Sequence, residues 1–175
     1  MITIGLDLSL THTGFVIVQD DGNVLSSGVI KSKPCGDKPA DETRRIRRIV
    51  EDTMAKITIV PDLVVIENLA FMAQGISLTQ LAGLSYYTRI NLLDRNWPFI
   101  LVAPTSLKKF ITGSGKGDKN MMLMSVYKNY GFEATDDNVA DGYSLAICGL
   151  ALLGKPLKDL TVAQKEVIKL LNKQL

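Results

Sequence analysis

A short apolar run that ends in a carboxylate constrains the fold of this chain more than any other feature. The residues of Leu63–Ile66 follow one another without a polar interruption, and Glu67 comes directly after them. A strand with one face in water alternates apolar and polar residues, whereas a continuous apolar run is typical of a strand buried on both faces. The run therefore predicts a sheet that helices cover on both sides.

Other strand patterns surround this one. The expected strands are residues 2–8, Phe15–Val18, Val24–Ile30, Leu63–Glu67 and Phe99–Ala103. The turn signal Asp21–Gly22 joins the second and third strands as a hairpin, and helical patterns alternate with the later strands. We therefore predict an α/β fold with a mixed five-stranded sheet, three antiparallel strands followed by parallel ones, flanked by helices.

Helical periodicity accounts for most of the remaining chain. The expected helices are residues 41–57, 76–96, 106–111 and 118–130, a segment that carries Asp141 and runs to Leu153, and a tail over 161–175. Met121, Met122 and Met124 are expected to fill the core. A chain of 175 residues is long enough for one substantial core. We expect a main domain over residues 1–155 and a helical tail over 156–175 that packs on it or extends from it.

The composition is that of an ordinary globular protein, with 46% apolar and 22% charged residues. No apolar run approaches the ~18 residues of a membrane span, and the amino terminus enters a strand where a signal peptide would carry an apolar segment. Cys35 and Cys148 form neither a disulfide framework nor a metal-ligand spacing. A reduced, cytoplasmic protein without a membrane partner is therefore expected.

Three carboxylates interrupt apolar patterns. Asp7 lies on the small, polar side of the first strand, Glu67 closes the apolar run, and Asp141 lies in the apolar stretch Val139–Ile147. Burying an ionised carboxylate is unfavourable unless a positive group compensates it, and no Lys or Arg is adjacent to any of the three. Distant basic groups or a shared divalent metal would compensate them. We favour the metal, because carboxylates that converge on Mg²⁺ suit metal-assisted phosphodiester chemistry.

Two neighbouring residues compete for a fourth place in this set. Asp137 lies four residues before Asp141, on the same side of a helix, and Asn138 lies three residues before it. A carboxylate is the better ligand for a hard cation, which favours Asp137 over the amide oxygen of Asn138. Asp137, beside Asp136, is equally compatible with a helix amino-terminal cap. The fourth ligand therefore stays open at this point.

Charge is unevenly distributed in the second half of the chain. Pro104–Gly131 contains five lysines against one aspartate, and Phe132–Asp141 contains four acids and no base. A basic stretch beside an acidic cluster suits a protein that binds phosphates next to a metal site. The glycine-rich part of the basic stretch fails the P-loop pattern, since Phe110 and Gly117 stand where other residues are required. No nucleotide cofactor is therefore expected.

A further basic run consists of Arg44, Arg45, Arg47 and Arg48, on the helix predicted over residues 41–57. Contact with a DNA arm is one interpretation of this run. On an amphipathic helix, however, such a run is usually the solvated face, and we prefer that interpretation.

Three blocks of the chain resemble the RuvC-type Holliday junction resolvases, in order over residues 3–150. The blocks are Gly5–Ser9 with Thr13–Phe15, Val65–Asn68 with Phe71–Ala73, and Val139–Ala146. One block alone is a weak signal, whereas three in order at suitable spacing are specific. The resemblance implies an RNase H-like fold and a homodimeric endonuclease that cuts four-way DNA junctions. It also implies two Mg²⁺ ions, with Mn²⁺ as a substitute, and a bacterial or phage-infected bacterial cell.

The resemblance implies roles for individual residues. Asp7, Glu67 and Asp141 would be catalytic metal ligands, and Asp137 would join them because Asn138 stands where the family usually has an acid or a histidine. Lys119 would act at the scissile phosphate. Lys108 also matches a basic residue of the family near that phosphate. Apart from the resemblance, the basic stretch itself suggests DNA contacts at Lys109 and Lys116 as well as at Lys108 and Lys119, and Phe71 is expected either to stack on an unpaired base or to be buried.

Other functions are compatible with parts of the pattern. A nuclease of the same fold can act on flaps, other branched DNA or RNA–DNA hybrids, since fold does not determine the substrate. Asn138 also leaves open a junction-binding module that does not cut. Asp7–Gly14 resembles the first phosphate motif of actin-type and sugar-kinase-type phosphotransferases, but those proteins close two such domains over ATP and this chain is too short.

Overall fold

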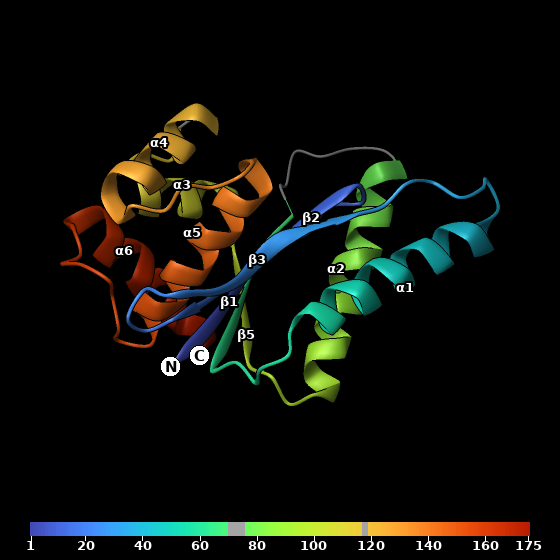
Figure 1. Ribbon diagram of the computed structural model, residues 1–175, viewed down its shortest axis with the longest axis horizontal. Coiled ribbons are helices and arrows are strands. Elements are labelled where there is room, and N and C mark those ends of the chain that lie inside the picture. The colour runs from blue at the N-terminus through green and yellow to red at the C-terminus, as the bar shows by residue number, and fades with distance from the viewer. Residues whose placement is uncertain (70–75, 117–118) are drawn as a thin grey trace.

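The structure is a computed structural model. It describes the backbone of residues 1–69, 76–116 and 119–175, and the side chains of these ranges apart from residues 76, 77 and 119. The sheet has five strands in the order β3-β2-β1-β4-β5 (Figure 1). The strands are β1 (Ile2–Asp7), β2 (His12–Gln19), β3 (Val24–Lys31), β4 (Leu63–Glu67) and β5 (Phe99–Val102). β1 pairs antiparallel with β2 and β2 with β3, whereas β1–β4 and β4–β5 are parallel, which confirms the predicted mixed sheet.

Helices cover both faces of the sheet (Figure 1). One face carries α1 (Pro39–Lys56) and α2 (Ile76–Asp94). The other carries α3 (Pro104–Thr112), α4 (Lys119–Tyr130), α5 (Asp137–Leu152) and α6 (Val162–Leu171), which continues into the short 3₁₀ helix η1 (Asn172–Gln174). No helix within the described residues is long and apolar enough to cross a membrane.

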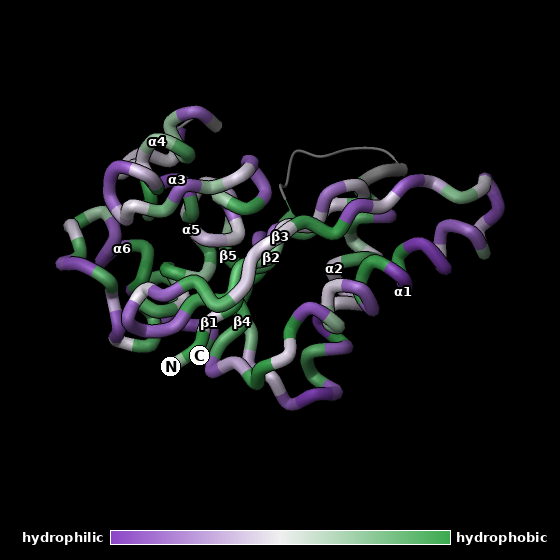
Figure 2. The backbone as a smooth tube through the Cα atoms, viewed as in Figure 1, coloured by the Kyte–Doolittle hydropathy of each residue, from purple (hydrophilic) through white to green (hydrophobic). Residues whose placement is uncertain are grey.

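The apolar run of β4 is buried on both faces, as predicted. Leu63, Val64, Val65 and Ile66 all have an exposed fraction of 0%. The side chains of Leu63 and Val65 pack into the core under α5, and those of Val64 and Ile66 pack into the core under α1 and α2. Figure 2 shows the same arrangement, with hydrophobic residues concentrated along the central strands.

Two helix details differ from the prediction. α1 begins at Pro39, two residues earlier than expected, because proline suits the first turn of a helix, where its missing N–H is not needed. Of the three methionines expected to fill the core, only Met122 of α4 does so, at 4% exposure. The expectation was wrong for Met121 and Met124, which are 46% and 70% exposed.

Helix α5 lies unusually close to β1. A Cβ atom on Gly5 would lie 1.8 Å from the carbonyl oxygen of Gly142, so only glycine is tolerated at this crossing. The hydroxyl of Thr3 donates a hydrogen bond to the carbonyl of Ala146 at 2.8 Å, which joins the same two elements. The close approach brings the first turns of α5 over the end of β1.

The carboxy-terminal segment is attached to the domain by two amide side chains. Buried Gln164 of α6 donates to the carbonyl of Phe110 at 3.0 Å and to the hydroxyl of Tyr130 at 3.1 Å. Gln174 of η1 accepts from the backbone N–H of Leu101 at 3.0 Å and donates to the carbonyl of the same residue at 2.9 Å. The tail thereby contacts α3, α4 and the outer strand β5.

Candidate active site

Asp7 and Glu67 end two neighbouring parallel strands. In the pairing of β1 with β4, Leu6 is opposite Ile66, so the next residue of each strand is a carboxylate at the same edge of the sheet. The turn after Asp7 is fixed locally, because the hydroxyl of Thr13 donates to the carbonyl of Ser9 at 2.7 Å and accepts from its N–H at 3.1 Å. Both carboxylates are half-buried. Ordinary strand geometry therefore brings together two acids that are 60 residues apart in sequence.

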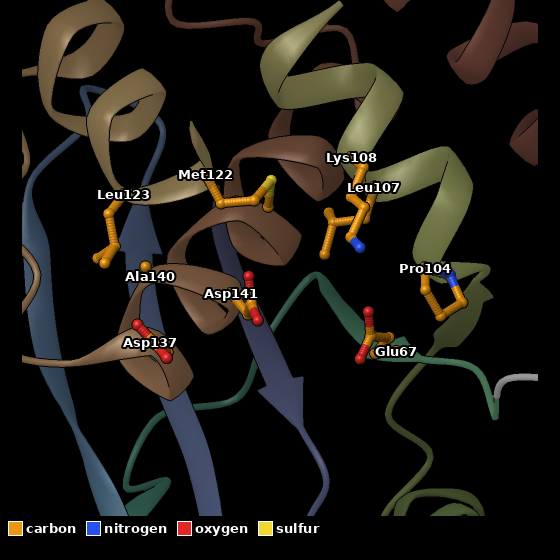
Figure 3. A pocket seen from close by; sticks show the side chains of 9 residues that line it. All are labelled: Glu67, Pro104, Leu107, Lys108, Met122, Leu123, Asp137, Ala140 and Asp141. Carbon is orange, nitrogen blue, oxygen red and sulfur yellow. The ribbon is translucent and has the colours of Figure 1, made fainter. Parts of the chain in front are cut away.

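A pocket of about 220 Å³ lies between this edge and α5. Figure 3 shows the side chains of Glu67, Asp137 and Asp141 at this pocket, with the amine of Lys108 directed toward the space between Asp141 and Glu67. The rest of the lining is mainly apolar and consists of Pro104, Leu107, Met122, Leu123 and Ala140. The sequence analysis considered only charged and aromatic residues for the site and did not predict that these apolar residues line it. The one sequence feature that points to this place is Pro104, which begins α3 directly after β5.

The pKa of Glu67 is raised from 4.5 to about 8. Burial is the main cause, followed by the negative charges of Asp7 and Asp141, while Lys108 acts in the opposite direction. A hydrogen bond between the carboxyl groups of Glu67 and Asp7 contributes as well. Glu67 therefore keeps a proton at neutral pH in the absence of further positive charge.

The acidic residues of this pocket are suited to a hard divalent cation. Among the described residues, no three Asp, Glu, His or Cys side chains are already close enough to enclose an ion. The negative charges of Asp7 and Asp141 nevertheless contribute to the raised pKa of Glu67, and a bound cation would relieve this repulsion. Carboxylate oxygens are also the ligands that Mg²⁺ and Mn²⁺ prefer. Donor chemistry and charge thus fit a metal, with Glu67 giving up its proton on binding.

Three consecutive polar residues at the amino terminus of α5 have different roles. Asp136 is the cap, since its carboxylate accepts from the backbone N–H of Val139 at 3.0 Å. Asp137 is the first helical residue and lines the pocket (Figure 3). Asn138 donates from its side-chain amide to Asp136 at 3.3 Å, and its backbone lies against Gly14 of β2. Asp136 therefore takes the capping role, and Asp137 faces the space between the acids.

The predicted basic residues are in different surroundings. Lys108 of α3 lines the pocket, whereas Lys109 forms an ion pair with Glu166 of α6 at 2.6 Å. Lys116 is exposed after the carboxy-terminal end of α3. The side chain of Lys119 and all of Phe71 lie outside the described residues, so the structure does not address their predicted DNA contacts.

Comparison with known proteins identifies the family. A profile of the Crossover junction endodeoxyribonuclease RuvC family matches residues 3–149, which is most of the chain. The chain belongs to this family. Members of this family are nucleases, and a metal requirement is consistent with the acidic pocket. Family membership also argues against the phosphotransferase interpretation.

Individual relatives agree with this assignment. The chain is 27% identical over 157 residues to Crossover junction endodeoxyribonuclease RuvC of Parafrankia sp., covering 86% of each protein. It is 26% identical over 150 residues to that of Corynebacterium glutamicum, covering 82% of this chain and 66% of the relative. The chain thus spans about two thirds of the Corynebacterium protein's length.

Solved structures confirm the fold. The Thermus thermophilus RuvC structure superposes with a TM-score of 0.73 at 20% identity, covering 89% of this chain and 98% of that one. T. thermophilus RuvC in complex with Holliday junction substrate gives a TM-score of 0.68 at 22% identity, covering 83% and 90%. The predicted RNase H-like architecture of the RuvC type is therefore correct.

Proposed function

We propose that this chain is a structure-selective endodeoxyribonuclease that hydrolyses phosphodiester bonds in four-way DNA junctions. The proposal is supported by a pocket in a member of the RuvC family that carboxylates of β4 and α5 line together with Lys108. Asp7 of β1 lies beside this pocket, since its carboxyl group shares a hydrogen bond with Glu67. The names of the relatives and the junction-bound Thermus structure support the same substrate.

Asp7, Glu67 and Asp141 would hold two Mg²⁺ ions, or Mn²⁺ in their place, with Asp137 as the fourth carboxylate. When bound, such ions activate water at neutral pH and stabilise the charge that develops on the leaving oxygen. Asn138 remains the rival fourth ligand, but its hydrogen bond to Asp136 and its contact with Gly14 favour Asp137.

The protein's own residues orient the DNA and exclude water. Lys108 faces the acids, so its ammonium would neutralise the non-bridging oxygens of the phosphate that is cut. Leu107 and Met122 are almost fully buried and line one wall, which lowers the local dielectric and strengthens that attraction. Lys119 and Phe71 stay predicted contacts, for the phosphate and for an unpaired base respectively.

A homodimer is part of this proposal. Tyr86, Ile90 and Leu93 of α2 are 60%, 49% and 62% exposed, and their spacing places them on one face of the helix. A row of exposed apolar side chains is typical of an interface, and a two-fold dimer would present two pockets to one symmetric junction. Ile90→Asp should yield monomers in light scattering, whereas Val60→Asp, at an exposed site away from the row, should not.

The deciding experiment compares substrates with one preparation of protein. Four-way junction, linear duplex, flap and RNA–DNA hybrid are each incubated with Mg²⁺, Mn²⁺ or EDTA, beside an Asp141→Asn control. We expect paired cuts in the four-way junction that need a metal and are lost in the control. Preferential cutting of flaps or hybrids would replace the proposed substrate, and tight junction binding without any cutting would indicate a non-catalytic module.

A further inference from the structure

The four arginines of α1 differ in what surrounds their side chains. Arg44 forms an ion pair with Asp41 at 2.6 Å, and Arg47 forms one with Glu51 at 2.8 Å. Both arginine side chains are 67% exposed, as expected of a solvated face. Arg48 is also exposed and lies beside these two, but it lines in addition, with half-buried Arg45, a cavity between α1 and the loop that follows β3. The solvated interpretation therefore fits Arg44 and Arg47, whereas Arg45 and Arg48 also face a cavity.

This cavity, which we call the basic cavity, has a volume of about 290 Å³. Its charged residues are Lys31, Lys33, Arg45, Arg48 and Asp52. Four cations thus face one carboxylate. Within the described part of the chain, none of the four cations is within ion-pair distance of a carboxylate. Uncompensated cations around a concave surface favour the binding of an anion.

One of the four cations holds the cavity wall in place. Arg45 donates to the hydroxyl of Ser32 at 3.1 Å and to the backbone carbonyl of Leu10. The backbone N–H of Ser32 in turn donates to the carbonyl of Thr11 at 2.9 Å. These bonds tie the loop after β3 to the turn after β1. Lys31, Lys33 and Arg48 are exposed and available to a ligand from solvent.

The basic cavity opens at the sheet edge that also carries the acidic pocket. β1 and β3 both run antiparallel to β2, so their carboxyl ends lie at one edge, along the upper side of the molecule in Figure 1. Asp7 and Val29 are both opposite Gly14, and Lys31 lies two residues beyond Val29. Two strand spacings and two residues separate Asp7 from Lys31, which is roughly 12 Å between Cα atoms. The basic cavity lies on the face of the sheet that α1 covers and the acidic pocket on the face that α5 covers, so DNA that crosses this edge can reach both sites.

We propose that the basic cavity binds a backbone phosphate of a junction arm while a neighbouring part of the same DNA occupies the acidic pocket. This inference rests on the proposed function, because it assigns part of that substrate to a second site. The ammonium groups of Lys31 and Lys33 and the guanidinium of Arg48 donate to the non-bridging phosphate oxygens. Such a contact orients the arm and carries no sequence preference.

The test compares two double variants that remove the same charge from the same region. Junction binding is measured in EDTA over a series of salt concentrations for the parent, Lys33→Ala/Arg48→Ala and Arg44→Ala/Arg47→Ala. Removing the cavity cations should weaken binding about tenfold and make the logarithmic salt slope shallower by up to about two. The control pair loses only residues of the solvated face and should change affinity less than about twofold. Equal effects of the two pairs, or none, would overturn the assignment.

A thiol in the cavity provides a second measurement. Cys35 lines the basic cavity and is exposed, whereas Cys148 is fully buried and burial raises its pKa to about 12. Alkylation by a maleimide therefore reports on Cys35 alone. The junction should slow this reaction several-fold in the parent and not in Lys33→Ala/Arg48→Ala. Equal protection by inorganic phosphate at the concentration of the junction would mean that the free anion alone is the ligand, which would overturn the assignment to a DNA arm.

Cleavage separates this inference from the proposed function. If the parent cuts junctions in Mg²⁺ and the cavity variants keep its salt slope, the cavity assignment is wrong and the function stands. If the parent neither binds nor cuts a junction, both proposals are wrong. Both proposals are supported if the parent cuts the junction and Lys33→Ala/Arg48→Ala shows a shallower salt slope and no protection of Cys35 by the junction.

Discussion

Replacing Glu67 with glutamine should stabilise the metal-free protein while it abolishes cleavage. Glutamine has nearly the same size, never ionises, and retains an N–H₂ donor for the hydrogen bond to Asp7. The folded-state pKa of Glu67, about 8, exceeds its ordinary value of 4.5, so the folded chain binds a proton that the unfolded chain releases between these pH values. The stability of the parent should therefore fall as pH rises from 4.5 to 8 and then level off.

The size of this effect follows from the same two values. A pKa of about 8 in place of 4.5 corresponds to about 5 kcal/mol of unfavourable free energy when Glu67 is ionised. Because the pocket is open to solvent on one side, we expect less than half of this in water, or about 2 kcal/mol at pH 8. For a chain of this length that corresponds to a rise in melting temperature of roughly 4–8 °C for Glu67→Gln.

Urea denaturation in EDTA at pH 5, 6, 7 and 8 measures the difference directly. Glu67→Gln should match the parent at pH 5 and gain stability steadily toward pH 8. Glu133→Gln changes an exposed acid before α5 and should stay within about 0.5 kcal/mol of the parent throughout. Mg²⁺ should then stabilise the parent more than Glu67→Gln, because the variant lacks a ligand. A gain that is the same at pH 5 and pH 8 would refute the reasoning.

Three further predictions concern the same pocket. Asp141→Asn should lower the cleavage rate by more than about 100-fold and leave junction affinity in EDTA within about threefold, since phosphate contacts and metal ligation are separable; retained cleavage would remove Asp141 from the site. Asp137→Asn should lower cleavage at limiting Mg²⁺ by at least about tenfold, and Asn138→Ala by less than about threefold; the reverse order in a Mg²⁺ titration would identify Asn138 as the ligand. Lys108→Ala should make the salt slope of junction binding shallower by about one. Lys108 lowers the pKa of Glu67, so Lys108→Ala should also move the dependence of the cleavage rate on pH to higher pH. An unchanged pH dependence would mean that Lys108 does not act on Glu67.

The layered fold could be predicted because its signals are local. The uninterrupted run Leu63–Ile66 indicated a strand buried on both faces, and each of its side chains proved fully buried. The Asp21–Gly22 turn indicated the β2–β3 hairpin, and the alternation of later strands with helices indicated the mixed sheet. The convergence of Asp7 and Glu67 could be inferred as well, since parallel strands end at one edge of a sheet.

Other features depend on geometry that no local pattern contains. Asp136, Asp137 and Asn138 are consecutive polar residues, and only the hydrogen bond from Val139 N–H to Asp136 identifies the cap. The arginines of α1 form one run in the sequence, but only Arg45 and Arg48 also line a cavity, because the loop after β3 passes beside them. Met124 carries the same apolar side chain as Met122 and is exposed because α4 turns it away from the core.

The two hydrogen bonds between the side chain of Gln174 and the backbone of Leu101 affect how readily the chain aggregates in concentrated solution. β5 is an outer strand, and such strands can recruit a strand from another molecule through their free backbone groups. The side-chain amide of Gln174 occupies both the N–H and the carbonyl of Leu101, as a neighbouring strand would. The η1 helix therefore covers part of the β5 edge and hinders its pairing with a strand of another molecule. Gln174→Ala would free both groups of Leu101, at a distance from the acidic pocket, and we expect it to raise the tendency to aggregate.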